Sequence, residues 1–245
     1  MTHTHRRRAF SLIEVIVVIG IIAMFLVLLV PFVLRTREAK RAELCAGNLK
    51  RIGAGILAYT KEHENRLPGP LATAQYPVRT AGNPARSDQL LKYIARYLDT
   101  PANSPGGPAG AKTIFSCPGW EQASREDDAP VFILNTDPVL PAGQPAWGAG
   151  DKPGLTLEEL KGWKRQIAGK DETVDLAKMW ALTDLDQGVT RILNINEKWV
   201  PGIPLKPVHV EHRNALYFDW HVEKLTLHRA YLGPSSIEEL EKEQN

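Results

Sequence analysis

Residues 6–34 read RRRAFSLIEVIVVIGIIAMFLVLLVPFVL, and this stretch decides how the N-terminal part of the chain folds. Three arginines precede an apolar run whose only charged side chain is Glu14, and no ionisable residue occurs from Val15 to Leu34. At about 1.5 Å per residue, a helix of this length reaches the roughly 30 Å that a bilayer core requires. The stretch therefore predicts a transmembrane helix over residues 10–34.

Glu14 is the costly residue in this run, because a carboxylate inside a membrane helix costs on the order of 2.5–3.5 kcal/mol even on insertion scales. It therefore needs a partner. A cut between Ala9 and Phe10 would create an α-amino cation at Phe10, four residues before Glu14. That amine would neutralise Glu14 of the same chain or of a neighbour. With such a cut, Ala9 and Phe10 would be processing residues, and Phe10 and Glu14 would be assembly residues.

The leader, cut site and helix resemble those of the type IV pilins and the pseudopilins of type II secretion. Precursors in these families have a short basic leader, a cut before Phe, a Glu four residues later and an unbroken apolar helix. The matching residues here are Arg6, Arg7, Arg8, Phe10, Glu14 and the run to Leu34, with Pro31 where pilin helices often carry a kinking proline. The chain departs from the pattern at Ala9, where the processing peptidase of these families prefers Gly.

This resemblance implies a structural subunit and not an enzyme, with no cofactor. It implies a leader over residues 1–9 that prepilin peptidase removes, and a single-pass protein of the bacterial inner membrane whose head lies in the periplasm. Its expected partners are copies of itself, other pseudopilins, the lipid bilayer and the inner-membrane platform that assembles a secretion or pilus filament.

Two other N-terminal signals share part of the pattern. An uncleaved signal anchor has a basic head and an apolar run, but it has no reason to carry Glu14. A twin-arginine signal fits the residues from Arg7 to Leu12, but no A-x-A-like cleavage site occurs after the apolar run. The alternative function is therefore a signal-anchored periplasmic binding or metal-dependent protein that acts as a single head.

The composition limits the function classes. A chain of 245 residues has room for this helix and one exported domain of ordinary size. The net charge of +2, with no basic stripe outside the leader, argues against a nucleic-acid partner. The two cysteines, Cys45 and Cys117, are a disulfide candidate in an exported head, and two buried free thiols are the alternative.

Residues 35–64 contain no helix breaker and predict an exported half of the same helix. Its apolar positions form one stripe that a sheet would bury: Cys45, Leu49, Ile52, Ile56 and Tyr59. The segment CAGNLKRIGAGILAYTKEHENRLP also resembles the C-x-N-N-L-K-Q-I-G-x-A-x-x-x-Y segment of a large bacterial pseudopilin-like family. The matching residues are Cys45, Asn48, Leu49, Lys50, Ile52, Gly53 and Tyr59.

The remaining chain predicts an α+β fold, in which the long N-terminal helix packs on a C-terminal antiparallel sheet. Residues 65–112 are a Pro/Gly-rich loop region with a short helix at 88–98, residues 113–232 a β-rich head, and residues 233–245 an acidic tail. Thr156 and Glu159 form a capping box that opens a helix to about Ile167. Strands are expected at 114–115, where Cys117-Pro118-Gly119 is the terminating turn, and at 131–134, 178–183, 190–195, 215–218 and 222–227.

The last two strands predict a β-hairpin that turns at Asp219-Trp220. The pseudopilin-like family carries a His, nine residues, Asp-Gly and then His-Val near its C-terminus, and His209, Asp219, His221 and Val222 match this pattern. Trp220 replaces the Gly. A tight hairpin turn requires positive φ, which Trp adopts only with strain, so either the turn type differs or packing of Trp220 offsets the strain.

Metal-binding side chains occur near this hairpin, and the weak zinc candidates are His209, His212, Asp219 and His221. Their spacing is not that of a zinc module, so no metal site is predicted. Asp184 and Asp186 suit a calcium loop in residue type, but two carboxylates are too few, and a solvated turn is the preferred interpretation. No nucleophile or phosphate-binding motif occurs.

Overall fold

The computed structural model describes residues 12–76, 88–98, 114–126, 129–136, 144–162, 164–167, 170–173, 175–193, 195–209 and 212–226. The chain divides into two compact units, Met1–Lys40 and Arg41–Asn245. The predicted leader, the cut between Ala9 and Phe10 and the acidic tail at 233–245 lie outside the described residues.

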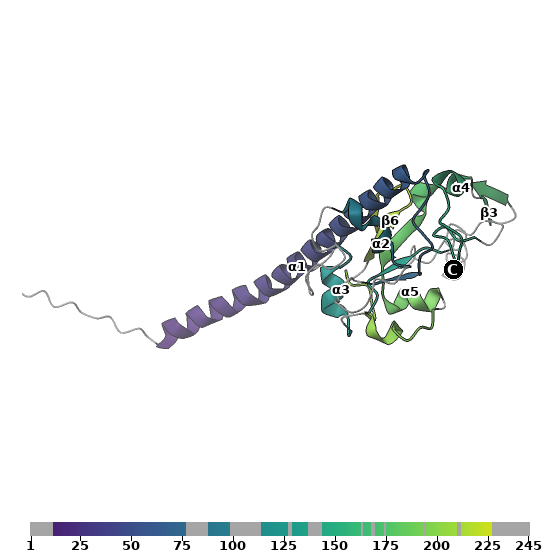
Figure 1. Cartoon of the computed structure of the whole chain (residues 1–245). Coiled ribbons are helices and arrows are strands. Elements are labelled where there is room, and N and C mark those ends of the chain that lie inside the picture. Colours follow the sequence, from purple (N-terminus) through teal and green to yellow (C-terminus); the bar gives the residue numbers. More distant parts are fainter. Residues whose placement is uncertain are drawn as a thin grey trace, which may run out of the picture. The chain divides into compact units, whose positions relative to one another are not determined.

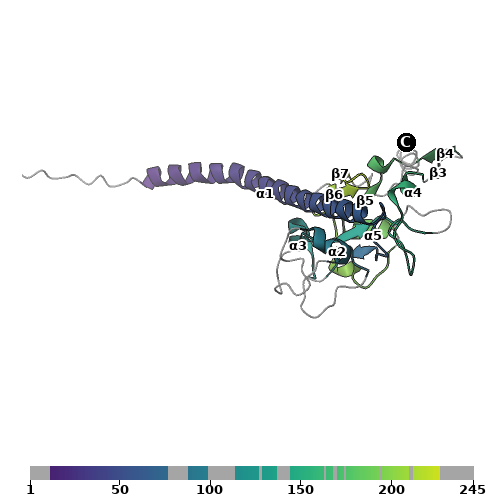
Figure 2. The ribbon, with the colours of Figure 1, turned by 45° about the horizontal axis from the view of Figure 1, so that its top comes forward.

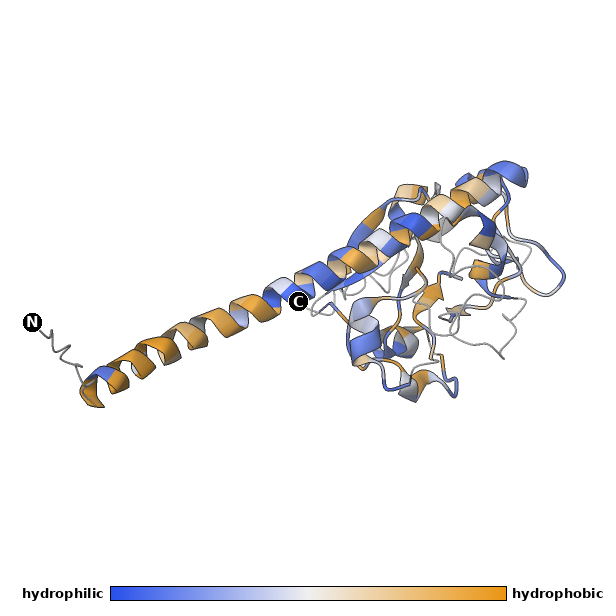
Figure 3. Cartoon of the chain, turned by 60° about the vertical axis from the view of Figure 1, so that its left-hand side comes forward, coloured by the Kyte–Doolittle hydropathy of each residue, from blue (hydrophilic) through white to orange (hydrophobic). Residues whose placement is uncertain are grey.

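The first unit contains the apolar part of helix α1 (Leu12–Glu62), which includes Pro31. Its large apolar side chains are exposed on every face, from 78% for Leu12 to 41% for Val33. Figure 3 shows this part of the helix as a nearly continuous orange ribbon. Within the described residues, α1 is the helix that is long and apolar enough to cross a membrane.

The second unit begins with the rest of α1, which buries one face. The predicted stripe is confirmed for Cys45, Leu49, Ile52 and Ile56, all 0% exposed, while Tyr59 is half-buried against the core. A spacing of three and four residues places these side chains on one side of the helix. This stripe packs on a sheet, as Figures 1 and 2 show for α1 and β6.

The sheet has five strands in the order β1-β2-β5-β6-β7, and every pair is antiparallel. The strands are β1 (Ala74–Gln75), β2 (Phe132–Leu134), β5 (Trp180–Asp184), β6 (His212–Tyr217) and β7 (Val222–Thr226). The α+β prediction is therefore confirmed, together with the strands expected at 131–134 and 178–183 and the C-terminal hairpin. A separate antiparallel pair, β3 (Lys164–Ile167) and β4 (Lys170–Thr173), was not predicted.

Short helices complete the second unit. They are α2 (Leu90–Ile94), which continues as the 3₁₀ helix η1 (Ala95–Tyr97), α3 (Pro118–Ala123), α4 (Leu157–Lys161), η3 (Leu176–Lys178), α5 (Gln187–Ile192) and η4 (Val200–Gly202). The helix expected at 88–98 and the capping box of α4 are confirmed, the latter by the hydrogen bond from the Glu159 N–H to Thr156 Oγ1 at 3.2 Å.

Three predicted elements are wrong. Residues 114–115 form no strand, and Pro118 begins α3 instead of a turn, because its fixed φ suits the first helical position. The helix at Thr156 ends at Lys161 instead of Ile167, where Gly162 is the C-cap. The strand expected at 190–195 is wrong, because residues 190–192 belong to α5, where the buried Asp186 carboxylate accepts from the Gly188 and Val189 N–H groups and so begins a helix.

Candidate functional site

The first candidate site is the N-terminal end of α1. Glu14 lies in the first helical turn, between the exposed apolar side chains Ile13 and Val15. A negative charge at this end of a helix is favoured by the helix dipole. The large apolar side chains that follow Glu14 along the apolar run are exposed.

The second candidate site is a junction where α1 is attached to the head. It uses three α1 residues on one face, Ala42, Cys45 and Asn48. Cys45 forms a disulfide with Cys117, with the two Cα atoms 4.9 Å apart. Asn48 Nδ2 donates to the Ser116 carbonyl at 2.8 Å, and the Ala42 carbonyl accepts from Asn214 Nδ2 at 3.0 Å. This short segment of α1 is thus bonded both to the residues that lead into α3 and to β6.

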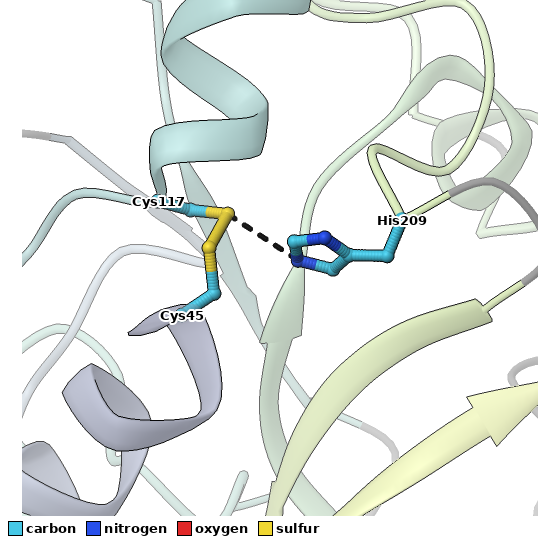
Figure 4. Close-up of side chains that lie close together, drawn as sticks. All are labelled: Cys45, Cys117 and His209. Atoms are coloured by element: carbon cyan, nitrogen blue, oxygen red, sulfur yellow. Dashed lines mark hydrogen bonds between the residues drawn. A yellow bond between two sulfur atoms is a disulfide. The ribbon is translucent and has the colours of Figure 1, made fainter. Parts of the chain in front are cut away.

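His209 lies directly against this disulfide (Figure 4), with its Nε2 3.4 Å from Cys117 Sγ. The same nitrogen is 3.3 Å from Asp184 Oδ2, and the two side chains are 1% and 2% exposed. Asp184 Oδ2 also accepts from the Asn214 backbone N–H at 2.9 Å. Asp184, the last residue of β5, is therefore a buried acceptor between β5 and β6.

Gly119 makes room for the imidazole. A Cβ at this position would lie 3.0 Å from His209 Cε1 and 3.1 Å from the Val208 carbonyl oxygen. Contacts this short mean that His209 or the Val208 backbone would have to shift to accept a larger residue. The three residues of this segment thus have separate roles: Cys117 supplies a sulfur, Pro118 begins α3, and Gly119 leaves space for His209. The sequence alone did not indicate the role of Gly119.

A buried ion pair lies next to the junction. Arg213 Nε and Nη2 donate to Asp186 at 2.5 and 2.8 Å, and both side chains are at most 1% exposed. The two candidate calcium ligands, Asp184 and Asp186, are therefore engaged by His209, Asn214 and Arg213. Neither carboxylate is open to solvent, so the preferred interpretation of these residues as a solvated turn is wrong.

The prokaryotic N-terminal methylation motif matches residues 4–30, which begin in the basic leader and end within the apolar part of α1. The chain carries the N-terminal signal of the type IV pilins and pseudopilins. Comparison with curated proteins gives no match, and comparison with solved structures gives none. The pilin-type signal indicates a structural subunit precursor, and together with the apolar helix it fits a membrane-anchored pilin.

The C-terminal hairpin does not gather the four weak zinc candidates into one site. The rings of His209 and His212 are 5.7 Å apart at the start of β6. Asp219 and His221 lie in the turn at its other end, where Asp219 Oδ1 contacts His221 Nδ1 at 2.5 Å and accepts from its backbone N–H at 3.2 Å. A six-residue strand, about 20 Å long, separates the two pairs.

Trp220 adopts positive φ, 73°, in this turn. The turn therefore has the left-handed backbone that the Gly of the related pattern would favour. Trp220 is half-buried and packs against the core, and this packing offsets the strain.

Proposed function

We propose that this protein is a pilin-like or pseudopilin subunit that assembles, through its N-terminal helix, into a type II secretion or type IV pilus filament. The single observation that carries the proposal is the match of the methylation motif to residues 4–30. The apolar surface of α1 supports it, because a helix exposed on every face needs either lipid or other helices around it.

In this proposal, prepilin peptidase cuts between Ala9 and Phe10 and leaves the mature chain in the inner membrane with its head in the periplasm. The new Phe10 amine then pairs with Glu14 of a neighbouring subunit. The pair offsets the cost of the carboxylate in an apolar surrounding. Phe10 and Glu14 thereby set the register of one helix against the next.

The junction suits the mechanical part of this role. A subunit drawn out of a membrane transmits force along α1, and the head must move with it. The Cys45–Cys117 disulfide joins α1 covalently to the segment that leads into α3, and hydrogen bonds at Ala42 and Asn48 hold the helix on both sides of it. This is a structural function, and the proposal assigns the protein no catalytic activity.

Mass spectrometry of the membrane-extracted chain tests the processing step. We expect a mature N-terminus at Phe10, carrying one methyl group on its amine. A chain that begins at Met1 or Thr2 in a cell with an active prepilin peptidase would contradict the proposal and favour a signal-anchored protein.

Filament incorporation tests the assembly step. Glu14→Ala should remove the chain from sheared filament fractions while its membrane level is unchanged. Glu38→Ala is the matched control, because Glu38 is an exposed carboxylate on the same helix beyond the apolar run. Equal incorporation of both variants would show that Glu14 has no assembly role.

A further inference from the structure

Positive charge follows directly after the apolar run of α1. Residues 35–41 read RTREAKR, and Arg35, Arg37 and Lys40 in this segment are exposed. Figure 3 shows the ribbon changing from orange to blue just beyond the apolar run. We call these three residues the collar, and all of them lie in the first unit. Among the described residues, no carboxylate forms an ion pair with any of them, so their charge is uncompensated within the chain.

The collar lies at the depth of lipid headgroups. The apolar run from Val15 to Leu34 spans about 30 Å, the thickness of a bilayer core, and the headgroup layer adds roughly 5–7 Å on each side. Along the helix axis, Arg35 and Arg37 lie about 1.5 and 4.5 Å beyond Leu34, and Lys40 lies about 9 Å beyond it. The long side chain of Lys40 reaches back over the remaining distance. All three cations therefore meet headgroups while the apolar run stays in the hydrocarbon core.

The directions of the collar side chains fit a lipid layer better than a protein partner. At about 100° per residue, Arg37 and Lys40 lie about 200° and 140° around the helix axis from Arg35. A folded partner contacts one face of a helix, whereas lipid surrounds the helix on every face. The large apolar side chains before the collar are likewise exposed on every face. Positive charge that is spread around the helix at this depth is complementary to anionic headgroups.

We propose that Arg35, Arg37 and Lys40 bind the headgroups of anionic phospholipids in the leaflet around this end of the apolar run. The two guanidinium groups donate pairs of hydrogen bonds to phosphate oxygens, and the Lys40 ammonium acts as a point charge. Each cation near an anionic membrane surface strengthens binding about fivefold. The inference does not rest on the filament proposal, because it concerns the helix of a single chain in a bilayer.

Spin-labelled lipids test the proposal on the full chain, reconstituted in vesicles of phosphatidylcholine with a minority of phosphatidylglycerol. Electron paramagnetic resonance measures how strongly each labelled lipid is motionally restricted by the protein. We expect labelled phosphatidylglycerol to associate with the chain at least about twofold more strongly than labelled phosphatidylcholine at low ionic strength. The average is below fivefold because lipids away from the collar are also counted. Equal association of the two lipids would overturn the proposal.

Two triple variants with the same change of charge locate the effect. The collar variant is Arg35→Gln/Arg37→Gln/Lys40→Gln. It should lose about half or more of the preference for phosphatidylglycerol, since the leader arginines at the other end of the run are unchanged. No loss of preference in this variant would refute the role of the collar.

The matched control removes three exposed cations that lie farther along α1, Lys50→Gln/Arg51→Gln/Lys61→Gln. The first of these cations comes about 24 Å of helix after Leu34, and a Debye length is about 8–10 Å at moderate salt. The control variant should therefore keep the native preference. An equal loss in both variants would show that the preference follows the total charge of the chain, and would contradict a site at the collar.

Salt tests the same contact without any substitution. In 1 M NaCl the Debye length falls to about 3 Å, so the native chain should associate almost equally with the two lipids. A preference that persists at this salt concentration would contradict an ionic contact. Sodium phosphate of the same ionic strength should act as NaCl does. If it displaces phosphatidylglycerol much more effectively, the collar is a site for free phosphate and the proposal is wrong.

Discussion

Substitutions of Trp220 test whether the backbone at this residue is strained. The strain decides whether the Gly or the Ala variant is the more stable. A residue other than Gly in the left-handed region costs about 1–2 kcal/mol, and Trp220 has φ 73°. Removing a buried Trp side chain costs about 3–5 kcal/mol, and about half of that is expected here because Trp220 is only partly buried. Trp220→Ala loses this packing and keeps the strain. Trp220→Gly loses the same packing but removes the strain.

We therefore expect Trp220→Gly to be more stable than Trp220→Ala by about 1 kcal/mol, after the larger chain entropy of Gly in the unfolded state is subtracted. At an ordinary position with negative φ the order is the reverse, by about 0.5–1 kcal/mol. The expected loss relative to the native chain is about 1 kcal/mol for Gly and about 2 kcal/mol for Ala.

Urea unfolding of the full chain in a non-ionic detergent, followed by tryptophan emission, measures these differences. All six tryptophans lie from Trp120 to Trp220, so the signal reports the head and not the apolar half of α1. Reduced emission from the lost indole is the same in both variants and does not affect the comparison. An Ala variant as stable as the Gly variant would refute the argument that the turn is strained at this residue.

Three further changes test the head. Cys45→Ala with Cys117→Ala should lower the free energy of unfolding by about 4 kcal/mol, because the disulfide closes a loop with a sequence separation of 72, and the matched control is the reduced native chain. Asp186→Asn should cost about 3–5 kcal/mol in urea unfolding, because it leaves the guanidinium of Arg213 buried beside a neutral amide, and the α5 N-cap keeps an acceptor. The pKa of Glu159 is lowered, chiefly because its carboxylate accepts a hydrogen bond from a backbone N–H at the start of α4. The contribution of Glu159 to stability is therefore present at neutral pH and is lost as the pH falls through that lowered pKa. Glu159→Gln should therefore differ from the native chain most at neutral pH and least once the pH is below that lowered pKa in thermal unfolding, whereas a constant difference would contradict the capping argument.

The elements that could be predicted from sequence are those with a local cause. The apolar run before Leu34 has no other stable form in or out of a membrane than a helix, and the stripe from Cys45 to Ile56 has helical spacing that only one face can bury. The capping box at Thr156 needs only four consecutive residues. In each case the residues that determine the structure are neighbours along the chain.

The elements that were missed have different causes, and one of them depends on a partner far away. Residues 190–195 are apolar enough for a strand, but Asp186 begins α5 just before them, and its carboxylate is held in place by Arg213, which is 27 residues away. β3 and β4 contain many charged residues and so have no apolar alternation to indicate them. Helix α4 ends early because Gly162 is its C-cap, a local end signal that the prediction did not use.

The candidate site shows the same limit more sharply. The sequence grouped His209, His212, Asp219 and His221 because they are close in sequence, but the contacts of His209 are with Cys117, 92 residues before it, and with Asp184. His209 and His212 lie at the start of β6, and Asp219 and His221 lie in the turn after its end. The four residues are therefore close in sequence but are separated in pairs by the length of the strand. No local pattern identifies a contact made across the head.

These contacts show what the residues that resemble the pseudopilin-like pattern do in the structure. The Cys45 segment, the Cys117-Pro118-Gly119 segment and His209 are far apart in sequence, yet they meet at one junction, where Gly119 leaves the space that the imidazole occupies. Asp219, at the other end of β6, orders the hairpin turn by accepting from the His221 N–H. A motif that spans His209 to Asp219 therefore marks the two ends of one strand. Its first residue contacts Cys117, which the disulfide joins to Cys45 of α1, and its last residue lies in the turn that follows the strand.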